Sequence, residues 1–139
     1  DLTNAREAIK ELGKFELRKY ELERQKKILR NKNDKISKKA LKKIAKDEGN
    51  HAALAWKTVK WMLKQHPQLI DVARRSMREM EETILKARLV KDENQWLIDY
   101  GIMSPKERIH MQVDVWKRVI APCFTSLCES MTENLSLPA

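Results

Sequence analysis

The sequence predicts an all-α fold, and three observations support this prediction. Only three glycines and four prolines interrupt the 139 residues. Leu, Ala, Glu, Lys, Arg and Met, which are good helix formers, dominate the chain, and β-branched residues do not alternate with polar ones. The length is that of one domain with a modest helical core. We therefore expect a single helical domain over residues 1–133 and a frayed tail over 134–139.

The first half of the chain predicts two long helices joined by a short turn. The first helix is expected over residues 4–30, with an apolar face that begins at Ala5, Ile9 and Leu12. Residues 31–34, Asn-Lys-Asn-Asp, have the composition of a turn. The second helix is expected over 36–66, because the residue before Pro67 leaves the helical region. Helices joined by so short a turn should lie antiparallel, as a long hairpin.

The second half predicts a third long helix and a shorter C-terminal helical region. The third helix is expected over residues 68–90, and a short one over 92–100 that ends at Gly101. Ser104 is followed by Pro and, three residues after it, by Glu, which is a helix start with Ser as N-cap. This helix should run to about residue 120, where Pro122 is expected to kink or restart the chain.

An ionisable pair, Glu48 and His51, interrupts the apolar face of the second expected helix. That face consists of Leu41, Ile44, Ala45, Ala52, Ala55, Val59, Met62 and Leu63. A buried carboxylate and imidazole are costly unless they are paired, hydrogen-bonded or bound to a metal. Glu-x-x-His on an inward helix face is also the ligand unit of di-iron bundles. The pair is therefore a candidate metal site, with a metal-free hydrogen-bonded remnant as the alternative.

Glu16 interrupts the apolar face of the first expected helix in the same way. It lies 17 residues before the centre of the predicted turn, near Asn33, and His51 lies 18 residues after it. Because antiparallel helices rise equally per residue, Glu16 should meet Glu48 and His51 at one height. Two carboxylates and one imidazole suit iron or manganese. A solvated helix face is the alternative for Glu16.

Residues 44–56, Ile-Ala-Lys-Asp-Glu-Gly-Asn-His-Ala-Ala-Leu-Ala-Trp, resemble the fourth bundle helix of bacterial ferritin-like domain proteins. Glu16 lies where that family carries its third-helix glutamate. The resemblance implies the C-terminal half of a ferritin-like bundle, with Glu16, Glu48 and His51 as metal ligands. A dinuclear iron or manganese site of this family needs four carboxylates and two histidines, so this chain would supply half. A second copy, or a separate N-terminal half-bundle chain, would supply the rest.

Positive charge is concentrated in residues 26–46. This stretch holds ten basic side chains and one acidic one, so it alone accounts for the net charge of +9. It could bind an acidic partner or a nucleic acid. A solvated face around an exposed turn is the alternative, because these lysines lie off the apolar stripe. The candidate binding residues are Lys32, Lys35, Lys38, Lys39, Lys42 and Lys43.

The cysteines and tryptophans carry weaker information. Cys123 and Cys128 do not have the spacing of metal ligands, and we expect buried or half-buried reduced thiols, which favours a reducing compartment over secretion. No apolar run approaches 18 residues, so no transmembrane helix is expected. Trp56 and Trp61 cannot share one helix face, so one of them is expected to face a partner chain.

The sequence leaves three hypotheses for the function of the protein. The leading hypothesis is a structural subunit that pairs with a second chain or copy in a larger assembly and carries a degenerate or shared metal site. The second is a di-iron or di-manganese oxidase or oxygenase site completed across the oligomer. The third is a basic helical module that binds nucleic acid. No Gly-rich phosphate loop, Ser-His-Asp spacing or His-Glu-x-x-His motif supports other enzyme classes.

Overall fold

The computed structural model describes residues 2–29, 35–87 and 104–136, and almost all of them are helical. The elements are α1 (Leu2–Leu29), α2 (Lys35–Gln65), the 3₁₀ turn η1 (Pro67–Leu69), α3 (Ile70–Ala87), α5 (Pro105–Val115), the π-helical turn η2 (Trp116–Ile120) and α6 (Ala121–Ser136). The described part contains no strand, which confirms the all-α prediction. The helix expected over 92–100 lies outside the described residues, as does its cap at Gly101.

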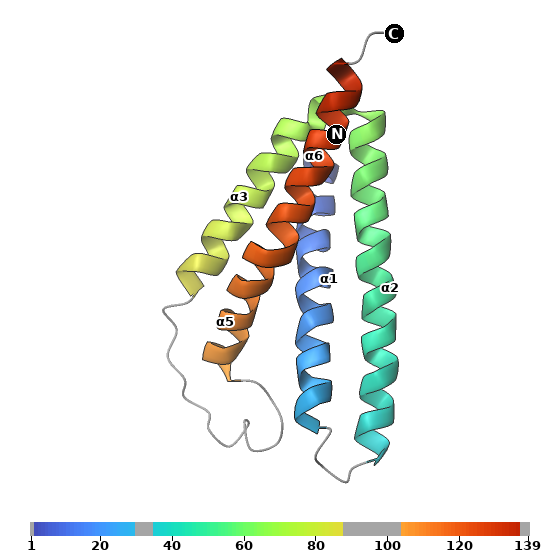
Figure 1. The fold of residues 1–139 in the computed structure, drawn as a ribbon, viewed down its shortest axis with the longest axis vertical. Coiled ribbons are helices and arrows are strands. Elements are labelled where there is room, and N and C mark those ends of the chain that lie inside the picture. The colour runs from blue at the N-terminus through green and yellow to red at the C-terminus, as the bar shows by residue number, and fades with distance from the viewer. Residues whose placement is uncertain (1, 30–34, 88–103, 137–139) are drawn as a thin grey trace.

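The helices form a bundle in which α1 is central (Figure 1). The helices α1 and α2 lie side by side in opposite directions, which confirms the predicted hairpin. α1 also packs against α3, α5 and η2, whereas α2 packs mainly against α1 and makes smaller contacts with η1 and α6. The apolar face of the hairpin is therefore covered largely by the chain's own later helices. The expected half-bundle, in which another chain covers the apolar face of the hairpin, is not confirmed.

The core lies where α1 faces the other helices. Its largest fully buried side chains include Ile9 and Leu12 of α1, Leu63 of α2, and Trp116 and Ile120 of η2. Gly13 lets α1 approach closely here: a Cβ at this position would overlap Met80 Cε and lie 3.6 Å from Trp116 Cζ3. The helix boundaries follow local chemistry, since α2 ends just before His66 and Pro67 as predicted.

The C-terminal region differs from the expected pair of short helices. Ser104 caps α5 as predicted, with its Oγ accepting a hydrogen bond from the Glu107 N–H at 3.1 Å. Pro122 does not restart the chain, because α5, η2 and α6 follow one another without a gap. A proline lacks an N–H and crowds the carbonyl four residues earlier. The π-helical turn just before Pro122 accommodates this by bonding the Ala121 N–H to the Trp116 carbonyl.

Within the described residues, none of the helices has the length and apolar character needed to cross a membrane.

Candidate functional site

Glu48 and His51 lie beside each other at the edge of the α1–α2 interface. His51 Nδ1 is 3.3 Å from Glu48 Oε1, and the His51 ring lies 5.3 Å from the ring of Phe15 on α1. Glu48 is half-buried, but the His51 residue is exposed, with 52% of its side chain accessible. The expectation that both lie in the middle of the buried stripe is therefore wrong.

The rotation of α2 explains this difference. The buried stripe is centred on Ala45, Ala52 and Val59, which are almost fully buried. Ile44 and His51 are each one residue earlier, about 100° around the helix, and lie on the exposed flank. Ile44 was expected in the core and is exposed as well. The pair therefore borders the core and is open to other molecules.

Glu16 is buried, with only 4% of the residue exposed, but it does not face His51. Its Oε2 accepts a hydrogen bond from Trp56 Nε1 at 3.0 Å, and its Oε1 lies 3.5 Å from Lys19 Nζ. The predicted position of Glu16 along the hairpin axis is nearly right, because the neighbouring residue, Phe15, contacts His51. One residue of helix turns the side chain by about 100°, so Glu16 points elsewhere.

The three predicted ligands do not form a metal site within one chain. Among the described residues, no group of three or more His, Cys, Asp and Glu side chains could hold a metal ion. Both oxygens of Glu16 already have partners, and only Glu48 and His51 are brought together. The residues of a single chain therefore do not fit a dinuclear centre, and any such centre needs ligands from elsewhere.

The described part of the chain exposes large hydrophobic side chains on α2. Its three large exposed hydrophobic side chains all belong to α2: Ile44, Leu54 and Trp61, the last two 63% and 62% exposed. We call these three residues the α2 outer face. Beside it, a cavity of about 200 Å³ is lined by His51 and Leu54 of α2 and by Phe15 and Glu11 of α1. Trp56 and Trp61 lie on different sides of α2, as predicted.

The predicted basic residues gather near the turn between α1 and α2. Lys39, Lys42 and Lys43 line a cavity of about 480 Å³ together with Lys26 and Lys46. Lys32 lies outside the described residues, Lys35 begins α2, and Lys38 is half-buried. Binding of an acidic partner or a nucleic acid at this end stays a prediction.

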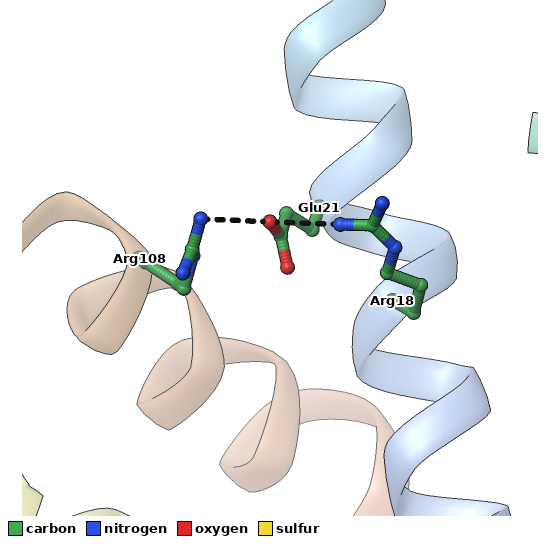
Figure 2. A network of polar contacts seen from close by, with 3 residues as sticks. All are labelled: Arg18, Glu21 and Arg108. Carbon is green, nitrogen blue, oxygen red and sulfur yellow. Dashed lines mark hydrogen bonds and ion pairs between the residues drawn. The ribbon is translucent and has the colours of Figure 1, made fainter. Parts of the chain in front are cut away.

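Sequence reasoning missed a buried carboxylate, Glu21, that ties two helices together. Its Oε1 lies 3.1 Å from Arg18 Nη1 on α1 and 3.2 Å from Arg108 Nη2 on α5 (Figure 2). Charge-assisted bonds of this kind fix the orientation of the groups that make them. Glu21 could have been found by extending the apolar face of α1, since it lies between buried Leu17 and Leu22. Its partner Arg108 is too distant in sequence to be inferred.

The two thiols have different surroundings. Cys123 is exposed, contrary to the expectation that both are at least half-buried, and Cys128 is buried. Burial raises the pKa of the Cys128 thiol, and the neighbouring Arg74 guanidinium offsets part of this rise. Cys128 therefore stays protonated at neutral pH and is an unreactive core residue.

Comparison of the chain with protein-family models, with curated proteins and with solved structures gives no match in any of the three. The resemblance of residues 44–56 to the ferritin-like signature thus stays a prediction.

Proposed function

We propose that this protein is a structural subunit that assembles with a second copy of itself through the α2 outer face. The observation behind the proposal is the position of Ile44, Leu54 and Trp61 on one edge helix. Scattered exposed hydrophobic residues are normal on a monomer, but several of them on one helix, with a groove beside Leu54, are typical of an interaction surface. Exposed tryptophan is also among the residues that contribute most to binding energy at interfaces.

The charges along α2 favour a second copy as the occupant. A two-fold axis at Leu54 would run two α2 helices antiparallel, so that Asp47 lies opposite residue 61 of the other copy. Asp47 would then lie next to Lys57 and Lys64 across the contact, and both lysines are exposed. A two-fold contact uses the same patch on both subunits, and this patch is self-complementary in charge as well as apolar at its centre.

The test is the oligomeric state of the full chain by light scattering after size-exclusion chromatography. We expect a dimer or larger species, and a monomer for Leu54→Ser and Trp61→Ser. Ala53→Ser is the matched control, because Ala53 is exposed on the same turn of α2 and lies off the α2 outer face. A monodisperse wild-type monomer at high micromolar concentration would contradict the proposal.

A charge exchange tests the two-fold arrangement itself. Asp47→Lys should weaken the dimer, because it places three lysines together at each end of the contact. Adding Lys57→Asp and Lys64→Asp to that variant should restore the dimer by reversing both signs. Failure of the reversal to restore dimerisation would refute this arrangement, even if Leu54 and Trp61 prove essential.

A metal site shared between chains is the second candidate. It is favoured by the Glu48–His51 pair, which lies open on the same side of α2 as the proposed contact. The test is the iron and manganese content of the natively purified protein, for the wild type and for Glu48→Gln combined with His51→Asn. Metal in the wild type that is lost in this variant would support the site. Metal retained by the variant, or none in either protein, would refute it.

A further inference from the structure

A separate cavity lies on the other side of the bundle, between α3 and the junction of η2 with α6. Its volume is about 240 Å³, and its walls include Arg74, Met77 and Arg78 of α3, Trp116 of η2, and Phe124 and Thr125 of α6. This volume is below the usual range for drug-sized ligands, so it suits a small molecule. No residue of the α2 outer face lines this cavity.

The lining of this cavity is cationic. Arg74 and Arg78 are one helical turn apart on the same face of α3, and both line the cavity. Arg74 is 3.9 Å from Asp71, a highly exposed carboxylate, which makes a weak ion pair. Arg78 forms no ion pair with any described residue. Glu81 also lines the cavity, so the lining as a whole carries one net positive charge.

A buried hydrogen-bond donor without a partner lies in the wall. Trp116 is 1% exposed, and its Nε1 has no acceptor among the described residues. Buried polar groups are nearly always hydrogen-bonded, so each exception calls for an explanation. The Cζ3 edge of this indole is directed toward Gly13 on α1. Its N–H is at the opposite edge of the ring and is therefore directed away from Gly13, but the Nε1 atom is buried and is not open to the cavity.

The backbone at this wall is unusual too. Trp116 begins the π-helical turn η2, and Ala121, which ends it, is another cavity residue. Single π-helical turns inside α-helices occur frequently at functional sites, because they displace a side chain from its regular position. Here the turn is needed to accommodate Pro122, and it also sets the position of Trp116 beside the two arginines.

We propose that this cavity binds a small organic carboxylate with an apolar body. The Arg78 and Arg74 guanidinium groups would donate hydrogen bonds to the carboxylate, which the planar guanidinium suits. Met77, Phe124 and Ala121 would contact the apolar body. The ligand thus gives the unpaired Arg78 guanidinium a carboxylate partner.

The test uses phenylacetate as the probe and the full chain as the protein. The chain has four tryptophans, and the indole N–H signal of Trp116 can be assigned in a ¹⁵N-correlated NMR spectrum by its loss in Trp116→Phe. We expect phenylacetate to shift this signal saturably at millimolar concentration, because the Trp116 indole forms part of the cavity wall. No saturable shift of the Trp116 signal would overturn the proposal.

Matched variants and probes test the chemistry. Arg78→Met should weaken phenylacetate binding by about tenfold or more, because a charge-assisted bond is lost. Arg75→Met is the control, since Arg75 is exposed on the same helix and does not line the cavity. Equal weakening in both variants would show attraction by the overall charge and would overturn the site. Equal binding of neutral phenylacetamide, or of inorganic phosphate, would overturn recognition of an organic carboxylate.

Discussion

The two helices of the N-terminal hairpin have similar lengths and sequences rich in Lys and Glu, yet their surroundings differ. α1 is enclosed by α2, α3, α5 and η2, whereas α2 has neighbours mainly on one side. Each helix carries ionisable residues within or beside its apolar face. On α1, Glu16 and Glu21 are buried and bonded to partners, and on α2, Glu48 and His51 remain open at the edge. An ionisable residue in an apolar helix face therefore indicates a hydrogen bond or ion pair inside the bundle when the helix is central. On an edge helix it indicates an accessible surface.

The largest expected effect concerns the truncation of one leucine side chain on each helix. Leu12 of α1 is fully buried, and Leu54 of α2 is largely exposed. Leu12→Ala should lower the free energy of unfolding by about 2–5 kcal/mol, because it leaves a cavity in the core. Leu54→Ala should change it by less than about 0.5 kcal/mol. Urea unfolding followed by circular dichroism measures both values.

The protein concentration is the control in this experiment. If α2 mediates self-association, Leu54→Ala loses stability only at concentrations where the wild type is oligomeric. Measurements in dilute solution isolate the single chain. Similar losses for both variants there would show that the outer face of α2 is covered within the chain, and the distinction between a central and an edge helix would fail.

A smaller effect is expected from neutralising one carboxylate on each helix. Glu21→Gln removes the charge shared by Arg18 and Arg108, and we expect a loss of about 1–3 kcal/mol. Both arginines are partly exposed and stay hydrated, which keeps the loss below that of a fully buried pair. Glu48→Gln should cost less than about 0.5 kcal/mol, because His51 is exposed. Unfolding free energies at neutral pH measure the difference.

A double-mutant cycle identifies the source of the Glu21 effect. Combining Glu21→Gln with Arg108→Met should show an interaction energy between the two positions, since they are in contact across α1 and α5. Additive losses would mean that Arg108 does not tie α5 to α1 and that the cost comes from Arg18 alone.

Local features of this fold can be predicted from the sequence, whereas the directions of side chains between helices cannot. The helix class, the hairpin and the Ser104 cap follow from composition and local chemistry, and the structure agrees with each. Burial of Glu16 follows from its place in the apolar stripe. The direction in which Glu16 and His51 point depends on the rotation of α1 against α2, and one residue changes it by about 100°.

The partners of Glu16 and Glu21 could not be predicted for a related reason. Trp56 and Arg108 come from elements far along the chain, and their positions depend on how those elements pack. The outcome at Pro122 depends on packing as well. The isolated sequence predicts a break, but Trp116, Ile120 and Phe124 are all buried in one core, which favours a continuous rod with a π-helical turn.

The smallest expected effect concerns the glycine in the middle of each helix. Glycine in a helix interior costs about 1 kcal/mol relative to alanine. Around a Cβ at Gly49 of α2 there is nothing within 4 Å, so Gly49→Ala should stabilise the protein by about this amount. A Cβ at Gly13 of α1 would displace the methyl end of Met80, which is flexible, so the gain is offset and the net change should be near zero.

Thermal unfolding of the two alanine variants measures this difference, with Ala53→Gly on α2 as a control for the intrinsic helix preference. The control replaces an exposed alanine, so it should lose about what Gly49→Ala gains. If Gly13→Ala gained as much as Gly49→Ala, the Met80 side chain would move aside without cost. The packing around Gly13 of α1 would then be loose. In that case the packing of α1 would not explain why Glu16 and Glu21 are bonded to partners within the bundle while Glu48 lies open at its edge.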